Sequence, residues 1–103
     1  MIKVNVKYNN NKVCELVIKG HAGYDVYGKD IVCAAVSSIA ITVINDIIAL
    51  DNDSIVYEEN SGLLKIRVIR DTEVNSKLLD NLVRMLTELK SQYPKNIEIR
   101  NED

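Results

Sequence analysis

The strongest constraint on the fold is a twenty-residue segment, residues 31 to 50, which contains neither glycine nor proline. Asp30 precedes it and is predicted to be the helix N-cap, because an aspartate oxygen accepts a hydrogen bond from a free backbone amide of the first turn. The polar residues of the segment are few: Ser37, Ser38, Thr42, Asn45 and Asp46. Since most of its circumference is apolar, the predicted helix has to be covered by a sheet or by another subunit.

Two segments before the helix alternate between apolar and polar residues, which is the period of half-buried strands. They are residues 2 to 8 and 12 to 19, and the asparagines between them tolerate the left-handed conformations of a tight hairpin turn. The alternation places Cys14 on the same face as Leu16 and Ile18, so Cys14 is expected in the core.

The second half of the chain again has two strands followed by a helix. Residues 54 to 58 and 63 to 69 are rich in β-forming residues and are joined through Asn60-Ser61-Gly62, which predicts a hairpin. Apolar residues at helical spacing predict an amphipathic helix over residues 73 to 92, and residues 96 to 100 alternate as a short strand. The predicted fold class is α+β, in the order strand-strand-helix-strand-strand-helix-strand, with one mixed sheet and two helices.

Length and charge narrow the range of functions. Residues 1 to 103 fit a single domain. Thirteen basic and fifteen acidic residues give a net charge of −2 without a basic cluster, so no direct binding of nucleic acid is expected. The longest unbroken apolar run, residues 31 to 36, is much shorter than the roughly 20 residues that span a bilayer, and the N-terminus lacks a signal-peptide pattern. We therefore expect a cytoplasmic protein without a membrane segment.

The cysteines and glycines exclude further kinds of site. Cys14 and Cys33 are the only cysteines and form no CxxC pair, so neither a disulfide nor a zinc site is indicated. The glycines match neither the phosphate-binding nor the dinucleotide-binding loop pattern. We expect neither a metal nor a cofactor.

The residues that suggest chemistry lie around the start of the apolar helix. Residues 20 to 30 hold three of the four glycines and lack a hydrophobic period, which predicts a long loop of the kind that often carries function. His21, the only histidine, lies where the preceding strand ends, and Cys33 is predicted in the first helical turn. Free amides and the helix dipole there favour a thiolate and can hold an oxyanion. An imidazole can take the thiol proton and return it to a leaving amine, so Cys33 and His21 can form the Cys-His dyad of a cysteine hydrolase.

Each of these residues also has a structural interpretation. A lone cysteine in an apolar helix is more often a small core residue than a nucleophile, and His21 can be a loop-edge histidine. Asp30 can act as a cap alone or as a charged partner of His21. Ser37, one turn beyond Cys33, can steady the site or bond back to the preceding turn. The loop glycines, which can simply permit positive φ angles, are Gly20, Gly23 and Gly28.

These residues resemble the motif of the Prp family of ribosomal-processing cysteine proteases. The matching residues are Gly20-His21-Ala22, Gly28, Asp30-Ile31-Val32-Cys33-Ala34 and Ser37. The resemblance implies an endopeptidase that removes a short N-terminal extension from a bacterial large-subunit ribosomal protein before or during ribosome assembly. It assigns the nucleophile to Cys33 and its base to His21.

The same resemblance implies a homodimer and a glycine-containing loop that moves when substrate binds. The expected hinges of that loop are Gly20, Gly23 and Gly28. Substrates of the family carry aromatic residues just ahead of the scissile bond, which implies an apolar groove beside Cys33. Tyr24 and Tyr27 are candidates to line this groove.

The alternative is a non-catalytic, ribosome-associated protein-binding module. In that case the helix over residues 31 to 50 serves a dimer interface and Cys33 is a packing residue. The rate of thiol labelling separates the two, since an exposed thiolate reacts at neutral pH and a buried structural thiol does not.

Overall fold

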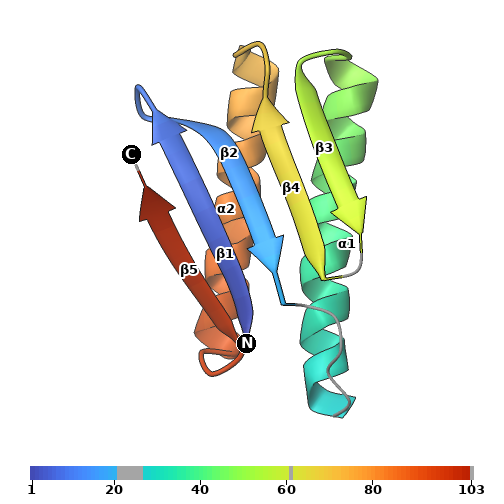
Figure 1. The fold of residues 1–103 in the computed structure, drawn as a ribbon, viewed down its shortest axis with the longest axis vertical. Coiled ribbons are helices and arrows are strands. Elements are labelled where there is room, and N and C mark those ends of the chain that lie inside the picture. Colours follow the sequence, from blue (N-terminus) through green and yellow to red (C-terminus); the bar gives the residue numbers. More distant parts are fainter. Residues whose placement is uncertain (21–26, 61, 103) are drawn as a thin grey trace.

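The computed structural model describes residues 1–20, 27–60 and 62–102, of which residues 27–30 by their backbone alone, and these form five strands and two helices. The elements are β1 (Ile2–Asn9), β2 (Lys12–Lys19), α1 (Tyr27–Leu50), β3 (Ile55–Asn60), β4 (Leu63–Val68), α2 (Glu73–Gln92) and β5 (Ile97–Glu102). The sheet order is β3-β4-β2-β1-β5; β1 and β5 are parallel, and all other neighbours are antiparallel. Both helices cover the same face of this sheet (Figure 1). The predicted α+β class, element order and mixed sheet are confirmed.

The hairpin of β1 and β2 contains a β-bulge that the alternation did not predict. Asn10 and Asn11 adopt the expected left-handed turn, with φ angles of 54° and 65°. The pairing with β1 skips Cys14, which becomes the extra residue of the bulge. Val13 therefore points into the core with Leu16, and Cys14 is only half-buried. The expectation that Cys14 is a core residue is wrong, because the bulge reverses the faces at the start of β2.

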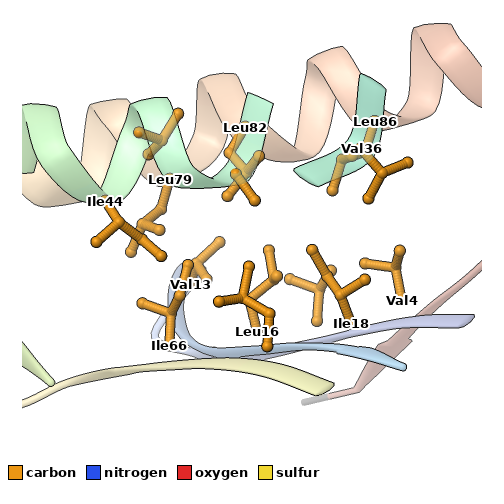
Figure 2. Packing of buried hydrophobic residues seen from close by; sticks show 14 of the residues in the cluster. Val4, Val13, Leu16, Ile18, Val36, Ile44, Ile66, Leu79, Leu82 and Leu86 are labelled. Carbon is orange, nitrogen blue, oxygen red and sulfur yellow. The ribbon is translucent and has the colours of Figure 1, made fainter. Parts of the chain in front are cut away.

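The hydrophobic core lies between the two helices and the covered face of the sheet (Figure 2). From the strands, Leu16, Ile18 and Ile66 point towards the helices. The buried stripe of α1 consists of Val32, Val36, Ala40, Val43, Ile44 and Ile47. The stripe of α2 consists of Leu79, Leu82 and Leu86, all fully buried. The core thus holds α1 by one side only, although its sequence is apolar on nearly all sides.

The uncovered surface of α1 remains apolar. Within the described residues, Ile31–Leu50 is long and apolar enough to cross a membrane by length and composition alone, with a mean hydropathy of 2.1 and 33% of the window buried. The length of the unbroken apolar run, residues 31 to 36, therefore underestimates the length of the apolar segment. The core helix of a soluble protein passes the same test, and one side of α1 does pack in the core. Length and composition therefore do not decide the question, and the absence of a membrane segment stays a prediction. Ile31 is 63% exposed, which leaves an apolar surface for another contact.

α1 begins at Tyr27, four residues before the predicted start. Asp30 is therefore the fourth residue of the helix and not its N-cap, and Gly28, expected in the loop, is helical. A helical glycine costs about 1 kcal/mol relative to alanine. Extending an existing helix, however, gains one backbone hydrogen bond for each residue added. This cooperative gain explains why the helix continues through Gly28.

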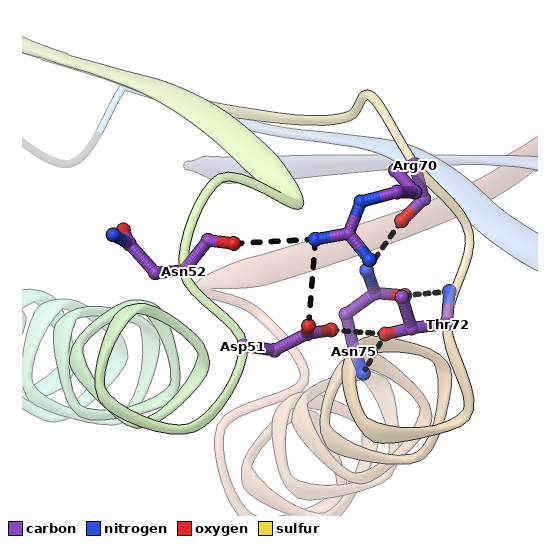
Figure 3. A network of polar contacts seen from close by, with 5 residues as sticks. All are labelled: Asp51, Asn52, Arg70, Thr72 and Asn75. Carbon is purple, nitrogen blue, oxygen red and sulfur yellow. Dashed lines mark hydrogen bonds and ion pairs between the residues drawn. The ribbon is translucent and has the colours of Figure 1, made fainter.

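A polar network holds the end of the molecule opposite to the start of α1 (Figure 3). Asp51 accepts a hydrogen bond from the Thr72 hydroxyl and lies 3.7 Å from the Arg70 guanidinium. The buried Asn75 donates to the Arg70 carbonyl at 2.9 Å and accepts from the Thr72 amide at 3.2 Å. Thr72 Oγ1 accepts from the Asn75 amide at 3.1 Å, which closes a capping box. The network joins the end of α1 to the start of α2.

Candidate active site

Cys33 is the seventh residue of α1 and lies in its second turn. One turn further along, Ser37 and Ile41 line a small recess together with Glu59 from β3 and Leu64 from β4. Cys33 and Ser37 are both half-buried, and Cys33 packs against the core cluster. Since residues four apart share a helix face, Cys33 lies next to this recess on its N-terminal side.

The end of β2 lies at the same end of the molecule as the start of α1 (Figure 1). There the Gly20 amide donates a hydrogen bond to the Gly62 carbonyl at 3.0 Å. Gly20 has a φ of +81°, and a Cβ at this position would lie 2.8 Å from the Met1 carbonyl oxygen. Only glycine meets both conditions without strain. The chain leaves the sheet at this point, and the next residue in the sequence is His21.

Most of the other predicted site residues lie outside the side chains that the structure describes. His21, Gly23 and Tyr24 lie outside the described residues, and only the backbone is described for Tyr27, Gly28 and Asp30. The contact between His21 and Cys33, the role of the tyrosines and the movement of the loop therefore stay predictions.

The early start of α1 places Cys33 further from the start of the helix than predicted. Cys33 is the seventh helical residue rather than the third, so its position is past the first turn, which holds the unpaired amides. The influence of the helix dipole falls off over the same turn. The helix start therefore favours the thiolate of Cys33 less than the sequence suggested.

Cys14 is far less suited to the role of nucleophile. It lies near the start of β2, beside Asn10, Val68 and Ile69, and away from the end of β2 that leads to His21. No disulfide joins it to Cys33. Among the described residues, no group of three or more His, Cys, Asp or Glu side chains could hold a metal ion.

Glu59 and Ile41 share the recess with Ser37, although neither was predicted to be a site residue. Glu59 belongs to no sequence motif. The available signal was the hairpin itself, because alternate residues of β3 must face the helix that covers the sheet. What the sequence lacked was the position of β3 at the edge beside α1.

The fold agrees with that of the known proteins to which the chain is similar. The family model for the cysteine protease Prp matches residues 1–98. A ribosomal processing cysteine protease Prp from Staphylococcus aureus (strain Mu50) is 32% identical over 103 residues, covering 96% of this chain and 97% of that protein.

Two solved structures of the Prp protease from S. aureus are similar over 99% of this chain and 100% of theirs. The complex with a substrate peptide has a TM-score of 0.87 at 26% identity. The complex with a covalently linked product peptide has a TM-score of 0.86 at 30% identity. The chain is thus a cysteine protease by fold and sequence. It belongs to the Prp family.

Proposed function

We propose that this chain removes the N-terminal extension of a bacterial large-subunit ribosomal protein during ribosome assembly, with Cys33 as nucleophile and His21 as base. The observation that carries the proposal is the family match over residues 1–98. It is supported by the half-buried position of Cys33 in the second turn of α1, a helix that starts at the end of the molecule where β2 ends (Figure 1). Because bacterial ribosomes assemble in the cytoplasm, the proposal also places the protein there.

The reaction follows from the chemistry of the two side chains. His21 takes the Cys33 proton, and the sulfur attacks the scissile carbonyl carbon to form a tetrahedral oxyanion. The imidazolium then gives its proton to the leaving amine, which breaks the peptide bond and leaves a thioester on Cys33. His21 next activates a water molecule, whose attack releases the extension as a carboxylic acid and restores the thiol. Ser37 lies one turn from Cys33 and is a candidate to steady it.

We further propose that the protein is a homodimer joined through the uncovered face of α1. Ile31 is 63% exposed there, and no residue from Ile31 to Asn45 is charged. Exposed small residues, such as Ala34 and Ser38, permit close approach of a second helix. Burying this surface against a second copy removes apolar area from water, which is the main driving force of association.

The test is cleavage of a peptide that contains the extension and the first residues of the mature ribosomal protein. The wild-type chain should release a single product pair, read by mass, and Cys33→Ala should release none because the nucleophile is gone. Cys14→Ala is the matched thiol control and should retain turnover. Cleavage by Cys33→Ala at the wild-type rate would instead favour the packing role of Cys33 and the non-catalytic binding module.

A further inference from the structure

β3 has one unpaired side, and the strand lies next to the flank of α1 that carries Ser37 and Ile41. In the described part of the chain, β3 pairs only with β4 and forms one edge of the sheet. Glu59, near its end, lines the recess with Ser37, one turn from Cys33. β3 therefore runs along α1 (Figure 1) and ends beside the turn that carries Ser37, one turn beyond Cys33.

The hydrogen bonding of the hairpin identifies the backbone groups that are available on this edge. Ile69 N–H donates to the Ser54 carbonyl at 2.9 Å, and the register places these two residues opposite each other. In an antiparallel pair, such hydrogen-bonded positions alternate with positions whose N–H and C=O point outwards. On β3 the outward positions are therefore Ile55, Tyr57 and Glu59, whose N–H and C=O groups face the open edge while their side chains lie on the α1 side of the sheet. Tyr57 and Glu59 are the two nearer the recess.

The charge on this edge favours one kind of occupant. Glu58 is on the opposite face of β3 and lies across from Lys65, whereas Glu59 lies across from Leu64. Among the described residues, Glu59 forms no ion pair and is exposed at the rim of the recess. A basic side chain on an incoming strand satisfies this carboxylate. A second copy of the same acidic edge does not, and a charge on an edge strand opposes such self-pairing.

We propose that the substrate binds as an extended strand on the open edge of β3, with a basic residue next to Glu59 and alternate side chains on the flank of α1. The proposal rests on the function proposed above. Strand addition of this kind takes its affinity from main-chain hydrogen bonds and its specificity from alternate side chains. Ser37 and Cys33 lie four residues apart, about 6 Å along the helix, which about two residues of strand span. The scissile bond therefore lies about two residues beyond the position that pairs with Glu59.

Hydrogen exchange tests the edge directly. The Cys33→Ala variant, which binds without cleaving, is mixed with the precursor peptide, and amide exchange is followed by NMR. The amides of Tyr57 and Glu59 should slow by about tenfold or more, because they gain partners in the complex. Those of Val56 and Glu58 already bond to β4 and serve as internal references. Bound peptide with unchanged Tyr57 and Glu59 amides would overturn the proposal.

Two further measurements separate this binding mode from other contacts. N-methylation of successive substrate amides should raise KM at every second position, since only alternate amides face β3. Glu59→Gln should lower kcat/KM through KM by about two- to fivefold, as expected of an exposed ion pair, and the loss should vanish when the basic residue of the peptide is neutralised. Glu58→Gln is the matched control and should leave kcat/KM unchanged.

The remaining outcomes are equally decisive. Protection of Tyr57 and Glu59 that rises with protein concentration without peptide would identify a second copy as the occupant and overturn the proposal. A peptide that wild-type protein cleaves without period-two sensitivity would overturn the strand addition and leave the protease function intact. A peptide that is neither cleaved nor bound would overturn both.

Discussion

The two helices cover the same sheet, yet they are built differently. α2 buries Leu79, Leu82 and Leu86 and turns charged residues outwards, and Thr72 and Asn75 cap its start. α1 buries a comparable stripe, but its other faces carry no charge from Ile31 to Asn45. A helix that only packs against a sheet gains from a charged outer face. This difference suits a scaffold role for α2, whereas α1 also carries the candidate nucleophile and the apolar surface that we propose as the dimer contact.

We expect the largest effect from replacing His21, the residue assigned as the base. His21→Ala should lower kcat by about 10²- to 10⁴-fold, the usual contribution of a positioned acid-base group, and leave the melting temperature unchanged. The pH profile of the wild type should show two ionisations from the coupled thiol and imidazole. Steady-state kinetics against pH measures both. A flat profile across neutral pH would contradict the pair.

The scaffold role of α2 predicts a stability effect without a catalytic one. Leu82→Ala removes a fully buried side chain and should cost about 2 to 5 kcal/mol of unfolding free energy. Turnover per folded molecule should stay at the wild-type value. Urea denaturation and active-site titration measure the two quantities. Met85→Ala, at a partly exposed position of the same helix, is the control and should cost much less.

The capping box at the start of α2 should contribute less than the core. Asn75→Ala removes the acceptor for Thr72 N–H and the donor for the Arg70 carbonyl in a buried place. The expected cost is about 1 to 3 kcal/mol, the penalty for buried polar groups left unsatisfied. Thermal unfolding measures it. If Asn75→Ala unfolds like the wild type, the network does not join the helices as described.

The outer face of α1 predicts a change in assembly and not in folding. Ser38→Arg would bury a charge in each half of the proposed dimer and should weaken association by about tenfold or more, since unpaired charges are costly at an interface. Thr87→Arg places the same charge on an exposed position of α2 and is the control. Sedimentation at several concentrations measures the association. Equal behaviour of the two variants would exclude this face as the interface.

Much of the fold was predictable because its signals are local. The period of each segment gave the order of the elements, and the left-handed turn at Asn10 and Asn11 followed from asparagine chemistry. The face of Cys14 was not predictable, since a bulge depends on how two strands pair. The contact of Asp51 with Thr72, 21 residues apart, also required the tertiary structure.

Part of the candidate site was likewise predictable from local sequence signals, and part of it required the tertiary structure. Cys33 and His21 were found from a local motif, whereas Glu59 meets Ser37 only through the sheet order and the hairpin register. The start of α1 was misplaced because Asp30 has the chemistry of a cap and follows a glycine-rich segment. Cooperative extension of the helix outweighs that local preference.

We expect the smallest change in stability from replacing Asp30. The sign of this change distinguishes a helix cap from a residue inside the helix. An N-cap aspartate loses about 1 kcal/mol on replacement by alanine and little on replacement by asparagine. Asp30 is instead the fourth residue of α1, and a negative charge in the first helical turn interacts favourably with the helix dipole, by about 0.3 to 1 kcal/mol, which both replacements remove. Alanine also has the higher helix propensity. Asp30→Ala should therefore be at least as stable as Asp30→Asn, measured by thermal unfolding at low salt. A clearly less stable Asp30→Ala would show that Asp30 acts as the helix cap after all.

Turnover of the same variants tests the charge of Asp30. A normally folded Asp30→Asn that has lost most of its turnover would make Asp30 the charged partner of His21, because an amide cannot stabilise an imidazolium.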